Sequence, residues 1–199
     1  TRLRPTTHLK AGHRTGGWRS GLLINPRLLF SVANRNSGQA MSHTSVLINE
    51  LAICLSARHL TLVTAESCTG GMIAAACTDL PGSSRWFECG FVTYSNRAKQ
   101  RDLNVSEHIL MNHGAVSEET VKAMVAGAAI HGDVAVAVSG IAGPGGAVEG
   151  KPVGTVWIGW GSKTEQHTCL CKFDGDRSEV RQQTLDRALT ELIGYVKKY

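Results

Sequence analysis

The sequence predicts a three-layer α/β/α sandwich with a mixed, mostly parallel sheet. Along residues 44–199, strand-like runs rich in β-branched residues alternate with segments of helical periodicity, a pattern typical of parallel strands covered by helices. Near the C-terminal end, two strand-like runs at residues 155–160 and 166–173 follow each other closely and predict a hairpin. The hairpin adds one antiparallel strand to the sheet.

The first half of this domain predicts two strands, each followed by a helix. A helical pattern starts at Thr44, which can cap it, and a strand follows at residues 60–64. Next come a small-residue helix over residues 69–78, an aromatic and β-branched strand over residues 86–94, and a short helix that begins over residues 96–100. The first strand is therefore joined to its helix by a short turn.

The second half predicts the centre of the sheet and the last helix. Ser117, followed by two glutamates, opens a helix. The run at residues 134–138 is apolar on both faces, which predicts a buried central strand, and it ends in the glycine-rich loop 139–146. A long helix extends from about Asp176 to Val196. Ligands of such sheets bind beyond the carboxyl ends of the strands, so we expect the functional site there.

Charge divides the chain into a basic leader, residues 1–43, and the domain of residues 44–199. Residues 1–49 carry seven basic and no acidic side chains, whereas the remainder has 14 basic against 16 acidic ones. The domain thus lacks the basic face that nucleic-acid binding needs. An apolar run of about 18 residues is also absent from the sequence, so no membrane partner is expected.

The leader has three interpretations: an organellar transit-type segment, a disordered basic arm, or upstream sequence read through from an early start. The chain begins with Thr1, and Met41 leads directly into a helical pattern. These two observations favour the third interpretation, with Met41 as the natural first residue.

Six cysteines are scattered through apolar contexts without a CxxC pair or a zinc-ligand spacing. We interpret them as reduced, mostly buried thiols of a cytoplasmic protein. The sequence therefore predicts no metal site, and no cofactor is expected.

Residues 65–71, AESCTGG, place nucleophile candidates at a strand-to-helix turn. Ser67, Cys68 and Thr69 could attack a carbonyl, and the N–H groups that begin the helix could bind an anion or an oxyanion. The alternative is an ordinary helix cap followed by two glycines, and the heptapeptide by itself favours that alternative. The loop at residues 145–152 nearly matches a nucleotide phosphate loop, but Pro152 replaces the magnesium-binding hydroxyl and a strand follows instead of a helix.

Six blocks in one order resemble the bacterial nicotinamide-nucleotide amidase family, whose module also forms the C-terminal domain of the competence/damage-inducible protein CinA. They are AESCTGG at residues 65–71, GSSxWF at 82–87, GFVTYSNxxK at 90–99, HGAVS at 113–117, SGIAGP at 139–144 and KPVGTVW at 151–157. The resemblance covers the chain from about Thr44 to the C-terminus and looks like the stand-alone form of the module.

This resemblance implies hydrolysis of the carboxamide of nicotinamide mononucleotide to nicotinic acid mononucleotide and ammonia, in pyridine-nucleotide recycling. It also implies a serine nucleophile at Ser67, assisted by Lys99 as general base, with Tyr94 nearby. The alternative function is a non-catalytic, CinA-type accessory module that binds nucleotide. We further expect a homo-oligomer, a dimer.

Each of these roles has a competing interpretation in the residues themselves. A free lysine is protonated at pH 7, so Lys99 can act as a base only if burial lowers its pKa; otherwise it is a solvated helix residue beside Arg97 and Arg101. Tyr94 could orient Lys99 or relay a proton, or simply be an aromatic residue at the end of a strand. Cys68 is chemically the better nucleophile, but no histidine has an evident relation to it.

Substrate contacts are expected from the ends of the strands and from the last helix. The phosphate is assigned to Arg177 and to unpaired N–H groups beside it, with a plain Asp176 helix cap as an equal alternative. The full set of predicted binding residues is Glu66, Cys68, Thr69, Gly70, Gly140, Gly143 and Arg177.

Overall fold

The computed structural model describes residues 41–198, and the predictions made for the leader lie outside these residues. In the described part, five strands form one sheet in the order β2-β1-β3-β4-β5. β1 pairs in parallel with β2 and β3, whereas β4 is antiparallel to both β3 and β5. The mixed sheet with one reversed strand, and β3 at its centre, confirm the prediction.

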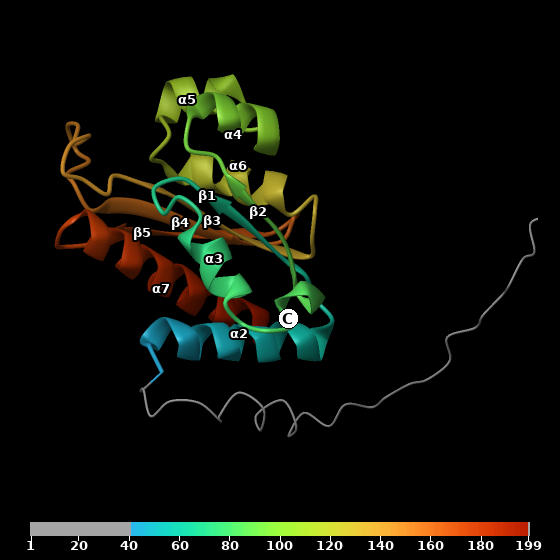
Figure 1. Ribbon diagram of the computed structural model, residues 1–199. Coiled ribbons are helices and arrows are strands. Elements are labelled where there is room, and N and C mark those ends of the chain that lie inside the picture. Colours follow the sequence, from blue (N-terminus) through green and yellow to red (C-terminus); the bar gives the residue numbers. More distant parts are fainter. Residues whose placement is uncertain (1–40, 199) are drawn as a thin grey trace, which may run out of the picture. The chain divides into compact units, whose positions relative to one another are not determined.

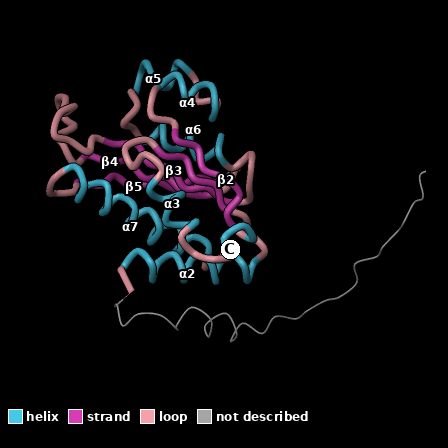
Figure 2. The backbone as a smooth tube through the Cα atoms, in the orientation of Figure 1, coloured by secondary structure: helices cyan, strands magenta, loops and turns pink. Residues whose placement is uncertain are grey.

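Helices cover both faces of the sheet, which completes the three predicted layers. α2, α3 and α7 lie on one face, and α4, α5 and α6 lie on the other (Figures 1 and 2). Within residues 41–198, no helix is long and apolar enough to cross a bilayer. The elements are α2 (His43–Arg58), β1 (Leu62–Glu66), α3 (Met72–Thr78), the 3₁₀ turn η1 (Ser83–Arg85), β2 (Phe87–Val92), α4 (Asn96–Leu103), α5 (Glu107–His113), α6 (Glu118–Ala128), β3 (Val134–Gly140), β4 (Thr155–Gly161), β5 (Gln166–Lys172) and α7 (Arg177–Val196).

The central strand, β3, contributes side chains to both hydrophobic cores. Val134, Val136 and Val138 pack into the cluster under α2 and α7, while Ala135 and Ala137 pack into the cluster under α6. Successive side chains of a strand point to opposite faces, so an apolar run of this kind must be covered on both sides. The prediction of a buried central strand is confirmed.

Two starts of elements and one helix illustrate where the structure differs from the sequence prediction. β1 begins two residues later than expected because the N–H of Leu60 closes the end of α2 on the carbonyl of Leu55. α3 begins at Met72, since Gly70 and Gly71 adopt φ values of 62° and 97° that no helix contains. α5 was not predicted; Leu110 is its one buried residue, so the segment has no readable apolar stripe.

The parallel strands bring the predicted site residues to one edge of the sheet. Past the end of β1, Ser67 N–H donates to Val138 O of β3 at 3.1 Å. Past the end of β2, Thr93 N–H donates to Glu66 O at 2.8 Å. The chain segments that follow β1, β2 and β3 therefore lie side by side at the edge where ligands of such sheets bind.

Candidate active site

Ser67 lies in the turn between β1 and α3, with 8% of its surface exposed. Its backbone is held on both sides, because its N–H bonds to β3 and its carbonyl accepts from Gly70 N–H at 3.1 Å. The positive φ of Gly70 lets the chain turn here without strain. Ser67 Oγ is thereby fixed at the edge of the sheet.

Lys99 extends from α4 to meet this hydroxyl. Its Nζ donates to Ser67 Oγ at 3.0 Å and to the backbone carbonyl of Thr93 at 2.6 Å, and only 1% of its surface is exposed. Both acceptors are neutral, and burial lowers the pKa of Lys99 to about 8. About a tenth of the lysine is therefore unprotonated at pH 7. The alternative of a solvated Lys99 is wrong, whereas Arg97 and Arg101 on the same helix are exposed.

A pocket of about 210 Å³ opens over this pair. Its far wall is the backbone at Ala115 and Val116, which two side chains hold in place. Ser139 Oγ donates to Ala115 O at 2.7 Å, and Lys151 Nζ donates to Val116 O at 2.8 Å. The residues around the pocket are Ser67, Cys68, Tyr94, Lys99, Ala115, Val116, Ser139, Gly140, Ala142 and Arg177.

Cys68 lines the same pocket, but its thiol stays protonated near neutral pH. Burial raises its pKa to about 11, and the opposing effects of the Cys68 and Thr69 N–H groups and of Lys99 are smaller. A thiol is a weak nucleophile until it ionises. Of the two neighbouring nucleophile candidates, Ser67 has the amine partner.

Glu66 was predicted to bind substrate, and the structure gives it a different role. The side chain is fully buried, and its carboxylate accepts from Thr69 Oγ1, Gly71 N–H, Ile73 N–H and Ala74 N–H at 2.6–3.1 Å. Three N–H groups at the start of α3, those of Gly71, Ile73 and Ala74, are therefore bound by the protein itself, and for these three the expectation of unpaired groups is wrong. The hydroxyl of Thr69 is also bound to Glu66, and the prediction that Thr69 contacts substrate stays a prediction.

Tyr94 borders the pocket with 62% of its surface exposed. Its hydroxyl accepts from a guanidinium nitrogen of Arg177 at 3.1 Å, and a second nitrogen of Arg177 donates to Gly143 O at 2.8 Å. The Thr93 carbonyl, not the Tyr94 phenol, holds Lys99. Of the interpretations of Tyr94, orientation of Lys99 through a hydrogen bond is not what the structure shows, while a catalytic role for Tyr94 stays a prediction.

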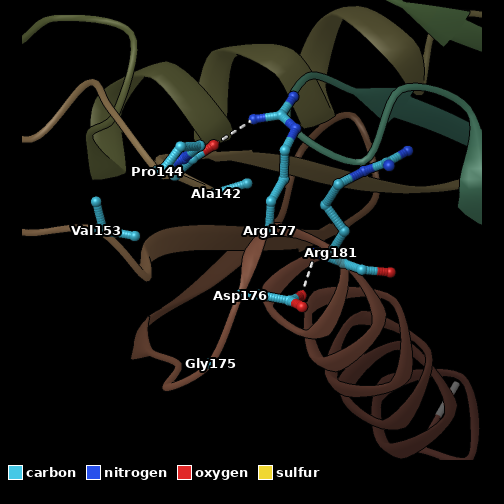
Figure 3. Close-up of a pocket in the computed structure, with 9 residues that line it drawn as sticks. Ala142, Pro144, Val153, Gly175, Asp176, Arg177 and Arg181 are labelled. Atoms are coloured by element: carbon cyan, nitrogen blue, oxygen red, sulfur yellow. Dashed lines mark hydrogen bonds between the residues drawn. The ribbon is translucent and has the colours of Figure 1, made fainter.

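A larger pocket of about 680 Å³ adjoins the first and shares Ala142 and Arg177 with it. Figure 3 shows Arg177 and Arg181 leaving α7 beside this pocket, with Arg177 reaching towards Pro144. Arg181 donates to Thr69 O at 2.8 Å, while its Nε is buried without a hydrogen-bond partner. Two cations therefore border one cavity, and no carboxylate is hydrogen-bonded to either among the described residues.

At the start of α7, the carboxylate of Asp176 binds two of the backbone N–H groups. Asp176 accepts from Ser178 N–H and Glu179 N–H, and Glu179 in turn accepts from Asp176 N–H at 2.7 Å. This reciprocal cap confirms Asp176 as the helix cap, but it does not include the N–H of Arg177, so the expectation of unpaired N–H groups beside Arg177 stays a prediction. Arg177 nevertheless lies at the cavity, as predicted.

The predicted glycines lie at close approaches of the chain. A Cβ on Gly140 would meet Val156 and the Thr155 carbonyl within 2.8 Å, and one on Gly143 would meet Val153 at 2.6 Å. Gly140 borders the small pocket and Gly143 the larger one, whereas Gly70 is in neither lining. The sheet-edge glycines thus let the backbone itself form pocket walls.

Sequence reasoning missed the Thr93 carbonyl, Ser139, Lys151 and Arg181. Arg181 follows Arg177 by four residues, so its place on the same face of α7 was readable from helical spacing. Ser139 and Lys151 each begin one of the six family blocks, but they and Thr93 act on or through backbone carbonyls, and the sequence does not show which carbonyl a side chain will bind. Among residues 41–198, no group of three His, Cys, Asp or Glu side chains could hold a metal ion.

Comparison with known proteins gives a consistent result. The family model described as the CinA C-terminal domain matches residues 44–196. A Pseudomonas putida protein named nicotinamide-nucleotide amidohydrolase PncC is 54% identical over 134 residues, which cover 66% of this chain and 84% of that protein. The Escherichia coli K12 protein of the same name is 50% identical over 149 residues, 73% of this chain and 90% of that one.

Solved structures agree with the fold. The crystal structure of competence damage-inducible protein A from Klebsiella pneumoniae superposes with a TM-score of 0.77 at 38% identity, covering 79% of this chain and 99% of that chain. Sequence and structure thus place residues 44–196 among the same set of proteins.

Proposed function

We propose that this chain, which belongs to the CinA C-terminal domain family, hydrolyses the carboxamide of nicotinamide mononucleotide to nicotinic acid mononucleotide and ammonia. The observation that carries the proposal is the buried 3.0 Å contact between Lys99 Nζ and Ser67 Oγ at the floor of a pocket. The names of the amidohydrolase relatives supply the substrate class. The reaction belongs to pyridine-nucleotide recycling, in a cytoplasmic setting, and needs no cofactor.

In the proposed mechanism, unprotonated Lys99 accepts the hydroxyl proton while Ser67 Oγ attacks the carboxamide carbon. The tetrahedral intermediate collapses as Lys99 returns the proton to the amide nitrogen, and ammonia leaves an acyl ester on Ser67. Water then attacks the ester, Lys99 takes a proton from it, and the carboxylic acid is released as the Ser67 hydroxyl reforms. A pKa of about 8 suits an amine that must both accept and return a proton near neutral pH.

The developing oxyanion requires donors that Glu66 has not already taken. We assign this role to the N–H groups of Cys68 and Thr69, because they follow Ser67 directly in the turn and both lower the pKa of the Cys68 thiol, against the larger effect of burial. They therefore stabilise negative charge directly beside Ser67. Both belong to the turn and not to α3.

The rest of the nucleotide is assigned to the larger cavity. The carboxamide and the phosphate lie at opposite ends of the substrate, and the two pockets share Ala142 and Arg177 between them. Arg177 and Arg181 supply guanidinium groups that suit a phosphate monoester. Tyr94, tied to Arg177, covers the nicotinamide ring at the junction and supports catalysis by fixing the substrate. Gly140 and Gly143 approach the substrate through their backbones.

A second candidate function is a non-catalytic module that binds nucleotide. Arg177 and Arg181 would serve it equally well, but it gives no reason to bury a lysine against a serine hydroxyl, since burial of an amine that can be charged is unfavourable. We therefore favour the enzyme.

Release of ammonia from purified protein tests the proposal. Nicotinamide mononucleotide should be hydrolysed, nicotinamide riboside more poorly, and free nicotinamide least. Ser67→Ala should abolish the reaction while preserving the fold and nucleotide binding, and Cys68→Ala should keep a substantial part of the activity. An inactive wild-type protein that still binds the nucleotide would favour the accessory module, and an inactive Cys68→Ala with an active Ser67→Ala would overturn the serine mechanism.

A further inference from the structure

Two neighbouring thiols on the edge strand β5 lie outside the site of the proposed reaction. Cys169 and Cys171 are alternate residues of this strand, so their side chains project from the same face. Their Sγ atoms are 3.7 Å apart, and each side chain is partly buried against the core beneath α7. The other free cysteines are Cys54, Cys68 and Cys77, which are buried, and Cys89, which lies on β2 at the opposite edge of the sheet.

The surroundings make one of the two thiols the nucleophile. A hydrogen bond from Cys169 lowers the pKa of Cys171 to about 7, against the effect of burial, and the positive charge of Arg187 on α7 acts in the same direction. The same contact raises the pKa of Cys169, and Glu191 on α7 adds to that rise. Of the two thiols, Cys171 is thus the one that ionises first, and Cys169 beside it keeps its proton.

We propose that Cys169 and Cys171 are a redox-active dithiol that reacts with low-molecular-weight disulfides and closes to an intramolecular disulfide. The Cys171 thiolate attacks one sulfur of the disulfide and releases one thiol, which leaves a mixed disulfide on Cys171. Cys169 loses its proton and attacks Cys171 Sγ, which forms the internal bond and releases the second thiol. The protein dithiol is oxidised by two electrons, and the added disulfide is reduced to two thiols.

The position on the strand makes this bond reversible. Two residues of extended strand span about 6.6–6.8 Å between Cα atoms, the upper end of the range that disulfides bridge. Closing the bond must therefore draw in the edge of the sheet, which β5 permits because β4 is its one partner in the described sheet. A disulfide that strains its strand is readily reduced again by free thiols.

The test exposes the full-length wild-type protein to glutathione disulfide at pH 7 and maps the products by peptide mass spectrometry. We expect Cys171 to react at least about fivefold faster than Cys89, and the end product to be a Cys169–Cys171 disulfide. Free reduced glutathione should restore both thiols. Equal modification of Cys89 and Cys171, or a mixed disulfide that never closes in the wild-type protein, would overturn the proposal.

Serine variants separate the two roles. Cys169→Ser should stop at the mixed disulfide on Cys171, whereas Cys171→Ser should leave Cys169 reacting no faster than Cys89. Cys89→Ser is the matched control, because it removes a partly buried strand thiol whose pKa burial raises, and it should behave as the wild type. Fast formation of a mixed disulfide on Cys169 in Cys171→Ser would contradict the assignment of the nucleophile.

Discussion

Two helices begin at the candidate site, α3 beside Ser67 and α7 at Arg177, and in each a carboxylate of the protein binds backbone N–H groups at the start of the helix. At α3 the carboxylate is that of Glu66, which is fully buried and accepts from four donors. At α7 it is that of Asp176, which is exposed and accepts from two N–H groups. The first cap fixes a reacting group, while the second leaves room for a ligand beside it.

This difference indicates that the α3 end of the site, at Ser67, and the α7 end, at Arg177, have different roles. At Ser67, the hydrogen bonds that Lys99 donates to Ser67 Oγ and to Thr93 O are buried, which holds the atoms in place for a reaction. Around Arg177 and Arg181 the cavity is larger, and charged side chains border it. Changes at the α3 end should therefore alter kcat and stability, whereas changes at the α7 end should alter KM.

The largest expected effect is at Lys99. Because its neutral form must accept a proton, kcat/KM should rise with pH and level off above about pH 8. Lys99→Arg keeps the positive charge but cannot deprotonate, so we expect kcat to fall by about a hundredfold or more. Steady-state ammonia release from pH 6 to 9 measures both effects, with Arg97→Lys, an exposed change on the same helix, as the control. A Lys99→Arg variant with near-normal kcat would move Lys99 to substrate binding.

Lys99 should also oppose stability. Its pKa is lower in the folded protein than in the unfolded chain, falling from 10.5 to about 8. Below pH 8, where the lysine is protonated in both states, this shift reduces the free energy of unfolding by about 3 kcal/mol. This penalty disappears as the pH rises from about 8 to 10.5. Lys99→Met should accordingly unfold at higher denaturant concentration at pH 7 while being inactive. A marked loss of stability in that variant would give Lys99 a structural role.

The next largest effect is expected for Glu66→Gln, which disrupts the buried cap at the start of α3. All four partners of the carboxylate are donors, so the amide nitrogen of glutamine must face a donor wherever it is placed. We expect about 2–4 kcal/mol of lost stability and a lower kcat with KM little changed, because the turn that carries Ser67 loosens. Urea unfolding and ammonia release measure the two quantities, and Glu88→Gln on the exposed face of β2 is the control. Unchanged stability would show that the buried cap is dispensable.

The two caps also show what the sequence could and could not predict. The helix from about Asp176 to Val196 was predicted, with Asp176 as its cap in one of two equal alternatives; Glu179, three residues later, is a local signal for that cap which the prediction did not use. Glu66 lies several residues before the N–H groups that it binds, across a turn whose two glycines have positive φ, so its pattern matches no local rule. The central strand and the hairpin followed from apolar runs, whereas α5 had none.

The same distinction holds for the site. Ser67 and Lys99 are 32 residues apart, and the sequence related them only through the family resemblance. Their contact depends on parallel pairing of β1 with β2, which places the start of α4 over the end of β1. The burial that lowers the pKa of Lys99 depends on that packing and cannot be read from the neighbouring residues Arg97 and Arg101.

At the α7 end, Arg177→Lys and Arg181→Lys should each weaken phosphate recognition. A lysine loses the forked geometry of the guanidinium, so we expect KM for nicotinamide mononucleotide to rise about tenfold with a smaller change in kcat. Nicotinamide riboside, which lacks the phosphate, should be hydrolysed at the wild-type rate by Arg181→Lys. Arg177→Lys, which also changes the contact with Tyr94, should affect the riboside less than the mononucleotide. Arg187→Lys, on the same helix but outside both pockets, is the control. An equal effect on the two substrates would separate these arginines from the phosphate.

The smallest effect, and the direct counterpart of Glu66→Gln, is expected for Asp176→Asn. Asparagine is itself a good helix cap, and its carbonyl oxygen can still accept from Ser178 N–H and Glu179 N–H, so stability should change by at most about 1 kcal/mol. The substitution also removes a negative charge from the cavity that holds Arg177 and Arg181. KM for nicotinamide mononucleotide should therefore fall about two- to threefold at low salt, less so at high salt, and remain unchanged for nicotinamide riboside. Loss of stability as large as that of Glu66→Gln would show that the two caps are equivalent after all, and an unchanged KM at every salt concentration would place the phosphate away from α7.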